Sequence, residues 1–238
     1  MANATEEWKP LSHAPLEKLS ENLWRVSGSL PRMTLRRTMT IARRGDGRLV
    51  IHSAIALDET AMKAIEALGP PAYLIVPSGF HRKDAPAFKR RYPELTVLAP
   101  RGARDKIAKV IPVDGALEEF PKDHAIHFEA IQGIGDAEGA MLVRSADGMT
   151  IVLGDIVFNM DSKKDPLGFF FTTLLGSAPG PRISRLVKAL MVKDRAALRA
   201  DLERLAATPG LVRLIVAHEK VAHGTDASAA LIAASKFL

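Results

Sequence analysis

The stretch Ile75-Val-Pro-Ser-Gly-Phe-His81-Arg-Lys-Asp84 is a turn between an apolar run and a helix, and the fold can be worked out from it in both directions. Residues 72–76 predict a buried strand, and Asp84-Ala-Pro86 predicts the start of a helix. The turn holds one histidine and one aspartate, which are side chains that bind metal ions. Catalytic metal sites need about three protein ligands, so this turn supplies part of such a site at most.

A hairpin and a helix come before this turn. Residues 39–51 contain two alternating apolar runs joined through Asp46-Gly47, a dipeptide that tolerates the positive φ of a tight turn. Residues 22–27 alternate in the same way, and Asp58 predicts the N-cap of a helix. With a further strand at residues 96–99, the order favours an α/β fold with a mixed sheet.

The second half of the chain repeats this order. Residues 140–153 form another hairpin through Asp147-Gly148, offset by 101 residues from the first. The offset aligns Ile51-His52-Ser53-Ala54 with Val152-Leu153-Gly154-Asp155. Apolar spacing then predicts four elements: a helix over 183–191, a helix over 198–205 behind an Asp194 cap, a buried strand over 211–217 and a closing helix over 226–238. The sequence thus predicts one domain over residues 21–238, built from two similar halves and preceded by a polar segment over residues 1–20.

Composition narrows the class of protein. The chain has 238 residues, 47% of them hydrophobic and 25% charged, which is typical of a globular protein with a sizeable core. It contains no cysteine, so His, Asp and Glu are its strong metal ligands, and a reducing, cytoplasmic setting is expected. The N-terminus has no apolar signal, and the longest apolar stretch, residues 167–175, is far shorter than the ~20 residues of a membrane span. We therefore expect no membrane partner.

The net charge of +6 is unevenly distributed. Residues 1–110 carry 19 Lys and Arg against 11 Asp and Glu, whereas the rest carry 14 against 16. An anion-binding site is therefore expected in the first half of the chain, although a solvent-exposed basic face explains the same charges. No nucleic-acid-binding pattern accompanies the basic residues, so we expect no specific nucleic acid partner.

One glycine motif can be set aside. Residues 133–139 resemble a dinucleotide-binding glycine loop, but that mechanism requires a helix to follow, and a hairpin follows here. A nucleophile elbow and a phosphate-binding loop are both absent from the sequence.

The paired hairpins, the turn at residues 77–84, and the strand ends Leu-Gly-Asp155 and Val-Ala-His218 together resemble the metallo-β-lactamase superfamily, from about residue 22 to residue 238. The resemblance implies a four-layer αββα sandwich with two mixed β-sheets. Members of the family bind one or two metals with an H-x-H-x-D-H turn, a histidine after the next hairpin region, an aspartate in a G-D turn and a last histidine at a strand end. Such metals activate water for hydrolysis and stabilise the attacking and leaving oxygens.

This chain keeps only part of that pattern. One register of the turn puts four residues at the ligand positions: Ser78, Phe80, Arg82 and Lys83. Shifting the register by one puts there Gly79, His81, Lys83 and Asp84. Where the middle histidine is expected, Asp136 and Glu138 are the candidate ligands. The resemblance implies that Asp155 is the bridging aspartate and His218 the closing histidine.

Each candidate also has a structural explanation. Asp84 fits a helix N-cap, His81 could cap or pack within the turn, and His52 fits a hydrogen-bonded core histidine. Asp155 could make a side-chain to backbone turn bond, although an aspartate at the end of a buried strand is costly without partners. An ion pair from Arg82 or Lys83 to Asp155 would replace a metal in the structure.

Two hypotheses follow. The first is a hydrolase-like protein with an incomplete metal site. The site would hold at most one divalent metal (zinc, iron or manganese) on His81, Asp155 and His218, with Asp84 or Glu138 as a further candidate ligand. Its reaction would be metal-assisted hydrolysis of an ester, amide or phosphoester. The second is a non-catalytic binding or assembly module that uses the cleft of the former metal site to bind a small anionic ligand at Arg82, Lys83 and Asp84. A homo-oligomer is compatible with both. The Phe169-Phe170-Phe171 segment predicts a buried core element, with a lid or a dimer contact as the alternatives.

Overall fold

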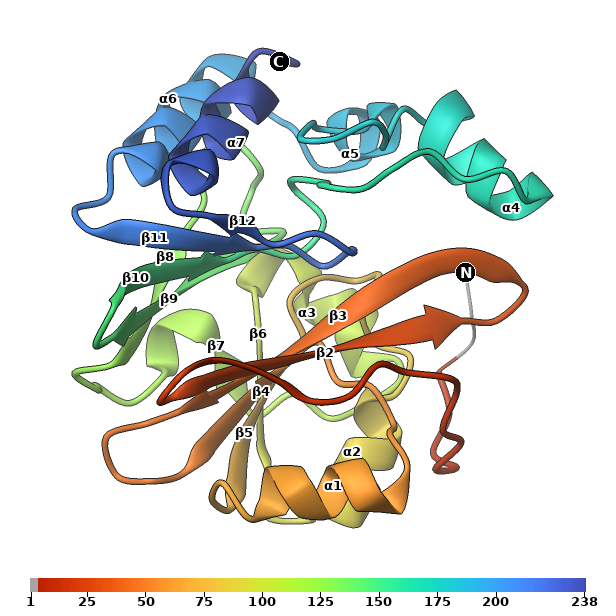
Figure 1. Cartoon of the computed structure of the whole chain (residues 1–238), viewed down its shortest axis with the longest axis vertical. Coiled ribbons are helices and arrows are strands. Elements are labelled where there is room, and N and C mark those ends of the chain that lie inside the picture. The colour runs from red at the N-terminus through yellow and green to blue at the C-terminus, as the bar shows by residue number, and fades with distance from the viewer. Residues whose placement is uncertain (1–3) are drawn as a thin grey trace.

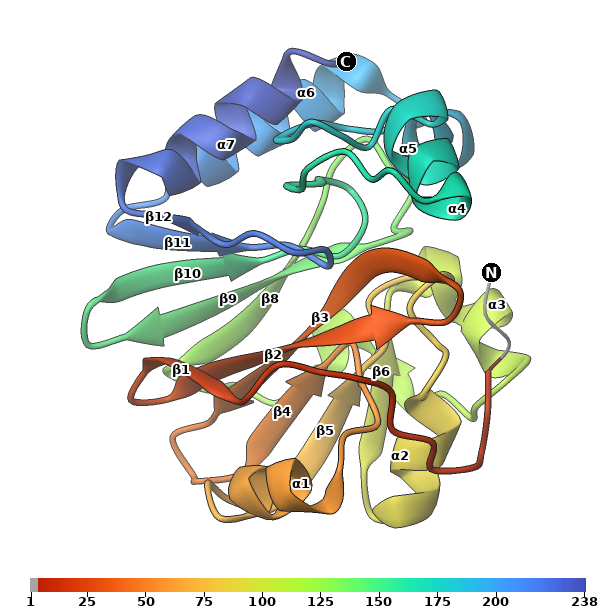
Figure 2. The ribbon, with the colours of Figure 1, turned by 45° about the vertical axis from the view of Figure 1, so that its right-hand side comes forward.

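The computed structural model describes residues 4–238, and these form four layers. Two β-sheets face each other, and helices cover the outer face of each (Figures 1 and 2). Helices α1 (Glu59–Glu66) and α2 (Ala85–Arg91) lie outside the seven-stranded sheet, and α6 (Arg195–Ala206) and α7 (Thr225–Ser235) lie outside the five-stranded sheet. The predicted αββα arrangement with two mixed sheets is confirmed.

The seven-stranded sheet follows chain order. Its strands are β1 (Glu17–Ser20), β2 (Leu23–Leu30), β3 (Met33–Arg43), β4 (Leu49–His52), β5 (Pro71–Ile75), β6 (Thr96–Ala99) and β7 (Gly115–Ala116). Neighbours from β1 to β4 pair antiparallel, and neighbours from β4 to β7 pair parallel. Short helices η1 (Arg101–Ala103), α3 (Arg104–Ala108) and η2 (Leu117–Glu119) complete this half.

The five-stranded sheet has the order β12-β11-β10-β9-β8. Its strands are β8 (Ile126–Ala130), β9 (Gly139–Ser145), β10 (Gly148–Val152), β11 (Leu211–Ile215) and β12 (Ala222–His223). Only β10 and β11 pair in parallel. Between β10 and β11 the chain forms α4 (Pro166–Phe169), the π-helical turn η3 (Phe170–Leu174), α5 (Arg185–Leu190) and α6.

The two halves share a pattern of strand pairing. Strand β4 lies between antiparallel β3 and parallel β5, and β10 lies between antiparallel β9 and parallel β11. The predicted alignment of the two hairpins therefore places Ser53 and Gly154 at equivalent positions, each just after a central strand. Both positions lie at the edge where the candidate metal ligands gather.

Three apolar clusters correspond to the spaces between layers. One lies between the sheets and includes Val50, Ile75, Ile126 and Val143. A second joins the seven-stranded sheet to α1 and α2, and a third joins the five-stranded sheet to α5, α6 and α7. Each sheet is thus buried on both faces, which explains why the central strands are apolar at consecutive positions.

Helix starts follow the predicted capping residues in two cases. Asp58 accepts a hydrogen bond from Ala61 N at 2.8 Å, and Asp194 accepts one from Ala197 N at 3.0 Å. Asp84 occupies the N-cap position of α2, but its side chain makes no capping hydrogen bond. It is drawn instead into a buried ion pair.

The N-terminal polar segment is in contact with the sheet. Residues 1–3 lie outside the described part of the chain, but Glu17–Ser20 form the edge strand β1. Trp8 Nε1 donates to Leu57 O at 2.8 Å, next to α1. The region predicted as a separate segment therefore shares hydrogen bonds with the seven-stranded sheet.

The Phe169-Phe170-Phe171 segment does not form a core element, so that prediction is wrong. Phe169 and Phe170 are exposed, and Phe171 is half-buried. Within residues 4–238, no helix has both the length and the apolar character needed to span a bilayer.

Candidate metal centre

Three strand ends from the two sheets bring His81, Asp155 and His218 together. His81 lies in the turn after β5, Asp155 follows β10, and His218 follows β11. One donor atom from each lies within 4.8 Å of the others. The carboxyl ends of β5, β10 and β11 therefore meet at one edge of the sandwich, as the resemblance implies.

Asp155 is the centre of this cluster. His81 Nε2 donates to Asp155 Oδ1 at 2.9 Å, and Ser78 Oγ donates to Asp155 Oδ2 at 2.8 Å. His218 Nε2 lies 3.5 Å from Asp155 Oδ1. Burial alone would raise the pKa of Asp155, but the two histidines outweigh it and hold the pKa well below its usual range. The aspartate is thus ionised although it is almost fully enclosed.

His218 is oriented by its second ring nitrogen. Its Nδ1 donates to Arg36 O at 2.8 Å, because a carbonyl can only accept. The ring stacks on Phe158, with centroids 5.5 Å apart and planes at 15°. Nε2 is then the ring nitrogen that faces Asp155, and a histidine whose other nitrogen donates to a backbone carbonyl is the arrangement found in metal-binding histidines.

Ser53 completes the surroundings of His81 and was missed by the sequence reasoning. Its Oγ is hydrogen-bonded to His81 Nδ1 at 2.8 Å. Ser53 has φ +61°, an uncommon conformation for a residue other than glycine, and it follows β4 directly. The 101-residue offset aligns Ser53 with Gly154, next to Asp155, so the internal similarity could have indicated this position.

Glu138 is not part of the donor cluster. Its carboxylate accepts from Gly154 N at 2.6 Å, Asp155 N at 2.7 Å and Ile156 N at 3.2 Å. Burial and the Asp155 charge raise the pKa of Glu138 to about 8, against the opposite effect of these backbone donors. A Cβ at Gly154 would lie 2.8 Å from Glu138 Oε2, so this close approach requires glycine. Glu138 fixes the turn that carries Asp155.

The predicted ion pair between Arg82 or Lys83 and Asp155 is not formed. Arg82 is hydrogen-bonded to Lys106 O, and Lys83 Nζ lies 2.7 Å from Asp84 Oδ1. His81, which is one residue closer to the strand end, takes the place beside Asp155 instead. The partner of Asp155 was therefore assigned to the wrong residue of the turn.

Asp84 belongs to a separate buried network. It pairs with Arg37 and Lys83, and its Oδ2 also accepts from Ala56 N at 3.1 Å. Arg37 is 5% exposed, so the network neutralises charge inside the protein. Asp84 is neither part of the donor cluster nor a side-chain cap.

His52 is a core histidine, as one of the alternatives predicted. It is 2% exposed, and burial together with the nearby His81 lowers its pKa to about 3. His52 is therefore neutral in the folded protein and lies outside the donor cluster.

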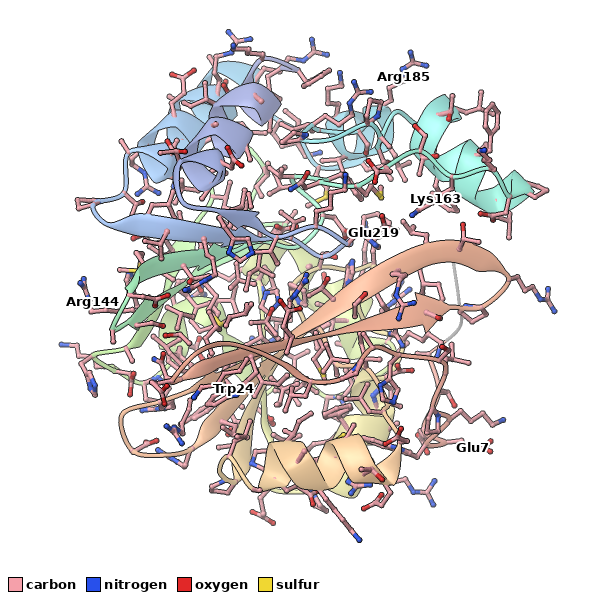
Figure 3. The ribbon with its side chains drawn as sticks, in the orientation of Figure 1. Glu7, Trp24, Arg144, Lys163, Arg185 and Glu219 are labelled. Atoms are coloured by element: carbon pink, nitrogen blue, oxygen red, sulfur yellow. The ribbon has the colours of Figure 1, made fainter. Side chains whose placement is uncertain are left out.

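A salt bridge lies directly beside the centre. Lys163 and Glu219, the residue after His218, are paired at 2.5 Å, and both side chains are largely buried. Figure 3 shows the two between the end of the five-stranded sheet and the segment that carries α4. They connect the long β10–β11 connection to the strand end that supplies His218.

The donor set fits one metal ion. Two histidines and one carboxylate are a common ligand set for zinc or iron, and Arg36 O and Ser78 Oγ supply the outer hydrogen bonds that such ligands need. Among residues 4–238 this is the single group of three or more such side chains with converging donor atoms. The residues present do not fit a second metal, because Glu138 is engaged with backbone amides.

Comparison with known proteins shows similarity in structure alone. No protein-family model matches the sequence, and no curated protein matches it. Among solved structures, DIM-1 metallo-β-lactamase exposed to ceftazidime aligns with a TM-score of 0.64 at 12% identity, covering 96% of this chain and 99% of that one. The mono-zinc form of the metallo-β-lactamase FIM-1 from Pseudomonas aeruginosa aligns with a TM-score of 0.60 at 11% identity, covering 98% of each chain. A metallo-β-lactamase from Pontibacter korlensis aligns with a TM-score of 0.62 at 9% identity, covering 94% and 99%. The chain therefore has the metallo-β-lactamase fold.

Proposed function

We propose that the chain is a hydrolase-like protein that binds one divalent metal, zinc, iron or manganese, at His81, Asp155 and His218. The observation that carries this proposal is the convergence of their donor atoms within 4.8 Å, with His218 oriented by Arg36 O so that its Nε2 faces Asp155. The proposed substrate is a small ester, amide or phosphoester. The three solved structures compared above are metallo-β-lactamases, one of them in a mono-zinc form, which supports the choice of chemistry.

The protein side chains have distinct roles in this proposal. A bound metal would supply a Lewis acid that polarises the carbonyl or phosphoryl group of the substrate. Ser53 orients the His81 ring, Ser78 orients the Asp155 carboxylate, and Glu138 holds the turn that carries Asp155. Asp155 accepts the Nε2 proton of His81, so a metal held by this nitrogen would have to displace that proton.

A non-catalytic anion-binding module is the less supported alternative. That hypothesis needs Arg82 and Lys83 to face the cleft, whereas Arg82 is bonded to Lys106 O and Lys83 is paired with Asp84. The basic groups named for the anion are thus already engaged.

Elemental analysis of the purified protein, after loading with each metal and removal of the excess, tests the proposal. We expect about one equivalent in the wild type and less than about a tenth of that in Asp155→Asn and His218→Gln, because each loses one of three ligands. His223→Gln is the matched control, since His223 is exposed on β12 and lies outside the donor cluster. Circular dichroism checks that each variant is folded.

Two outcomes would contradict the proposal. One is a wild type that retains no metal after loading with zinc, iron or manganese. The other is metal retained equally in the wild type and in both ligand variants.

A further inference from the structure

The connection between β10 and β11 carries a short helical projection. Helix α4 continues directly into η3, and α5 lies next to them, joined through Arg185 N donating to Leu175 O at 2.8 Å. Figures 1 and 2 show α4 standing away from the sheets at one side of the molecule. We call residues 163–190 the projecting segment.

The α4–η3 helix has its apolar side outward. Leu167, Phe170 and Leu174 follow helical spacing and are 43%, 45% and 52% exposed. Gly168 and Thr172 are buried on the inner side, where Thr172 Oγ1 donates to Gly168 O and accepts from Lys163 N. A surface helix normally turns its apolar side to the protein core, so this reversed arrangement indicates a partner outside the chain.

The projecting segment also holds most of the exposed apolar side chains. Seven large hydrophobic residues are exposed among residues 4–238, and five of them are in this segment: Leu167, Phe169, Phe170, Leu174 and Leu190. Singly exposed apolar residues are common, but five in one segment are not.

Positive charge accompanies this apolar surface. Residues 166–193 contain four Lys and Arg and no Asp or Glu, within a half of the chain that is net negative. Arg185 Nη1 donates to Leu174 O at 3.4 Å, at one end of the apolar helix, and Lys164 is exposed at the other end. Figure 3 shows Arg185 within this segment, and Lys163 at its start, where it is paired with Glu219. Asp165, the acidic residue at the helix start, is bonded to Thr34 and to Gly168 N.

We propose that the projecting segment docks the protein on an anionic membrane surface. Exposed Phe and Leu side chains on a convex helix, with cations at both ends, match the apolar boundary and the negative headgroups of such a surface. A second copy of the chain fits less well, because a two-fold contact through this segment brings its unpaired cations close to their own copies. The expectation of no membrane partner rested on the lack of a spanning segment, and docking at the interface does not require one.

Co-sedimentation with lipid vesicles tests this proposal. Two vesicle types are compared: phosphatidylcholine alone, and phosphatidylcholine with about a third phosphatidylglycerol. We expect binding to the anionic vesicles that weakens as salt is raised, and at least about tenfold weaker binding to the neutral ones.

Paired variants separate the apolar and the charged contributions. Leu167→Ser with Phe170→Ser should weaken vesicle binding about tenfold or more, with a control in Ile232→Ser, an exposed apolar residue on α7. Lys164→Gln with Arg185→Gln should weaken it by roughly fivefold for each charge removed, with a control in Arg90→Gln on α2. All four targets in the segment are exposed, and thermal unfolding checks that the variants remain folded.

The proposal fails if the wild type does not sediment with anionic vesicles, or if both paired variants bind as the wild type does. It also fails if light scattering shows a dimer that Leu167→Ser with Phe170→Ser converts to a monomer while no vesicles are bound. That last result would assign the surface to a second copy of the chain.

Discussion

His52, on β4 beside the candidate centre, gives the protein a predictable response to acid. Its pKa of about 3 in the folded protein lies below the ordinary value of 6.5, so protonation favours the unfolded chain. The stabilising contribution is complete above pH 6.5 and is lost as the pH falls toward 3. We expect the loss to reach roughly 4 kcal/mol for this residue alone.

Replacing His52 with a residue that does not titrate isolates this effect. Denaturant unfolding of the wild type and His52→Asn, followed from pH 7 to pH 4, should show the wild type losing more stability than the variant. The exposed His223 serves as the control, because His223→Asn should follow the wild type at each pH. Parallel curves for wild type and His52→Asn would contradict the prediction.

The buried pair of Arg37 and Asp84 is the second residue-scale test. Asp84→Asn leaves the Arg37 guanidinium enclosed without its main counter-charge, so we expect a loss of about 3–5 kcal/mol in the free energy of unfolding. The matched control is the exposed pair of Arg48 and Asp46, where Asp46→Asn should cost less than about 1 kcal/mol. Equal losses in urea unfolding would show that burial of the ion pair is not decisive.

At this scale the sequence indicated the three candidate donors, which the structure brings together, but not the residues that orient them. Asp155 and His218 stood out because each ends a buried strand, and His81 because it was the histidine of the turn. Ser53, Arg36 and Arg37 were missed because their roles depend on contacts between segments far apart in the chain. Glu138 was named as a candidate ligand, and only its bonds to Gly154, Asp155 and Ile156 reveal its structural role.

The two hairpins differ in how much they depend on glycine. Gly148 has φ +136°, and a Cβ there would meet Gly210 O and Val212 Cγ1, both at 2.6 Å. Gly47 has φ +84°, and a Cβ there would have no neighbour within 4 Å. We expect Gly47→Ala to cost about 1–2 kcal/mol from backbone strain and Gly148→Ala about 3 kcal/mol or more, because it adds a clash with backbone. Thermal unfolding of the two variants checks the order, and a reversed order would contradict it.

The sequence predicted where helices and strands occur better than it predicted which of their faces are buried. Asp46-Gly47 and Asp147-Gly148 identified both hairpins, and Asp58 and Asp194 identified two helix starts, because these signals are local. The segment around Phe170 was predicted to be core, since apolar runs usually are. Periodicity gives the spacing of an apolar face but not what covers it, so the outward orientation of the α4–η3 helix required the structure.

At the scale of the whole molecule, the candidate centre joins the two sheets. His81 comes from the seven-stranded sheet, whereas Asp155 and His218 come from the five-stranded sheet. A metal that binds the folded chain should stabilise it by about 2.7 kcal/mol at a concentration 100 times its Kd. The gain should shrink as the pH falls, because the metal competes with protons for the histidines.

Thermal unfolding with and without added metal measures this stabilisation. His81→Gln should abolish the rise in Tm, and His223→Gln should preserve it. An equal rise in both variants would assign the effect to another part of the protein.

The order of elements was enough to predict the sandwich, because the repeated hairpin, helix and strand pattern has few compact solutions. The sequence is only 9–12% identical to those of the solved structures, so the similarity to them lies in the arrangement of strands and helices and not in the side chains. The chemistry could not be predicted to the same degree, since all four turn positions in one register, and three of the four in the other, hold residues other than the family's ligands.

Because the candidate donors come from both sheets, the distance between the donors depends on the packing between the sheets. The side chains of that interior, among them Ile126 and Val143, set the spacing of the sheets and therefore the size of the site that an ion must fill. Replacing one of them with a smaller side chain, or applying hydrostatic pressure, would change which ion fits without altering the three candidate ligands.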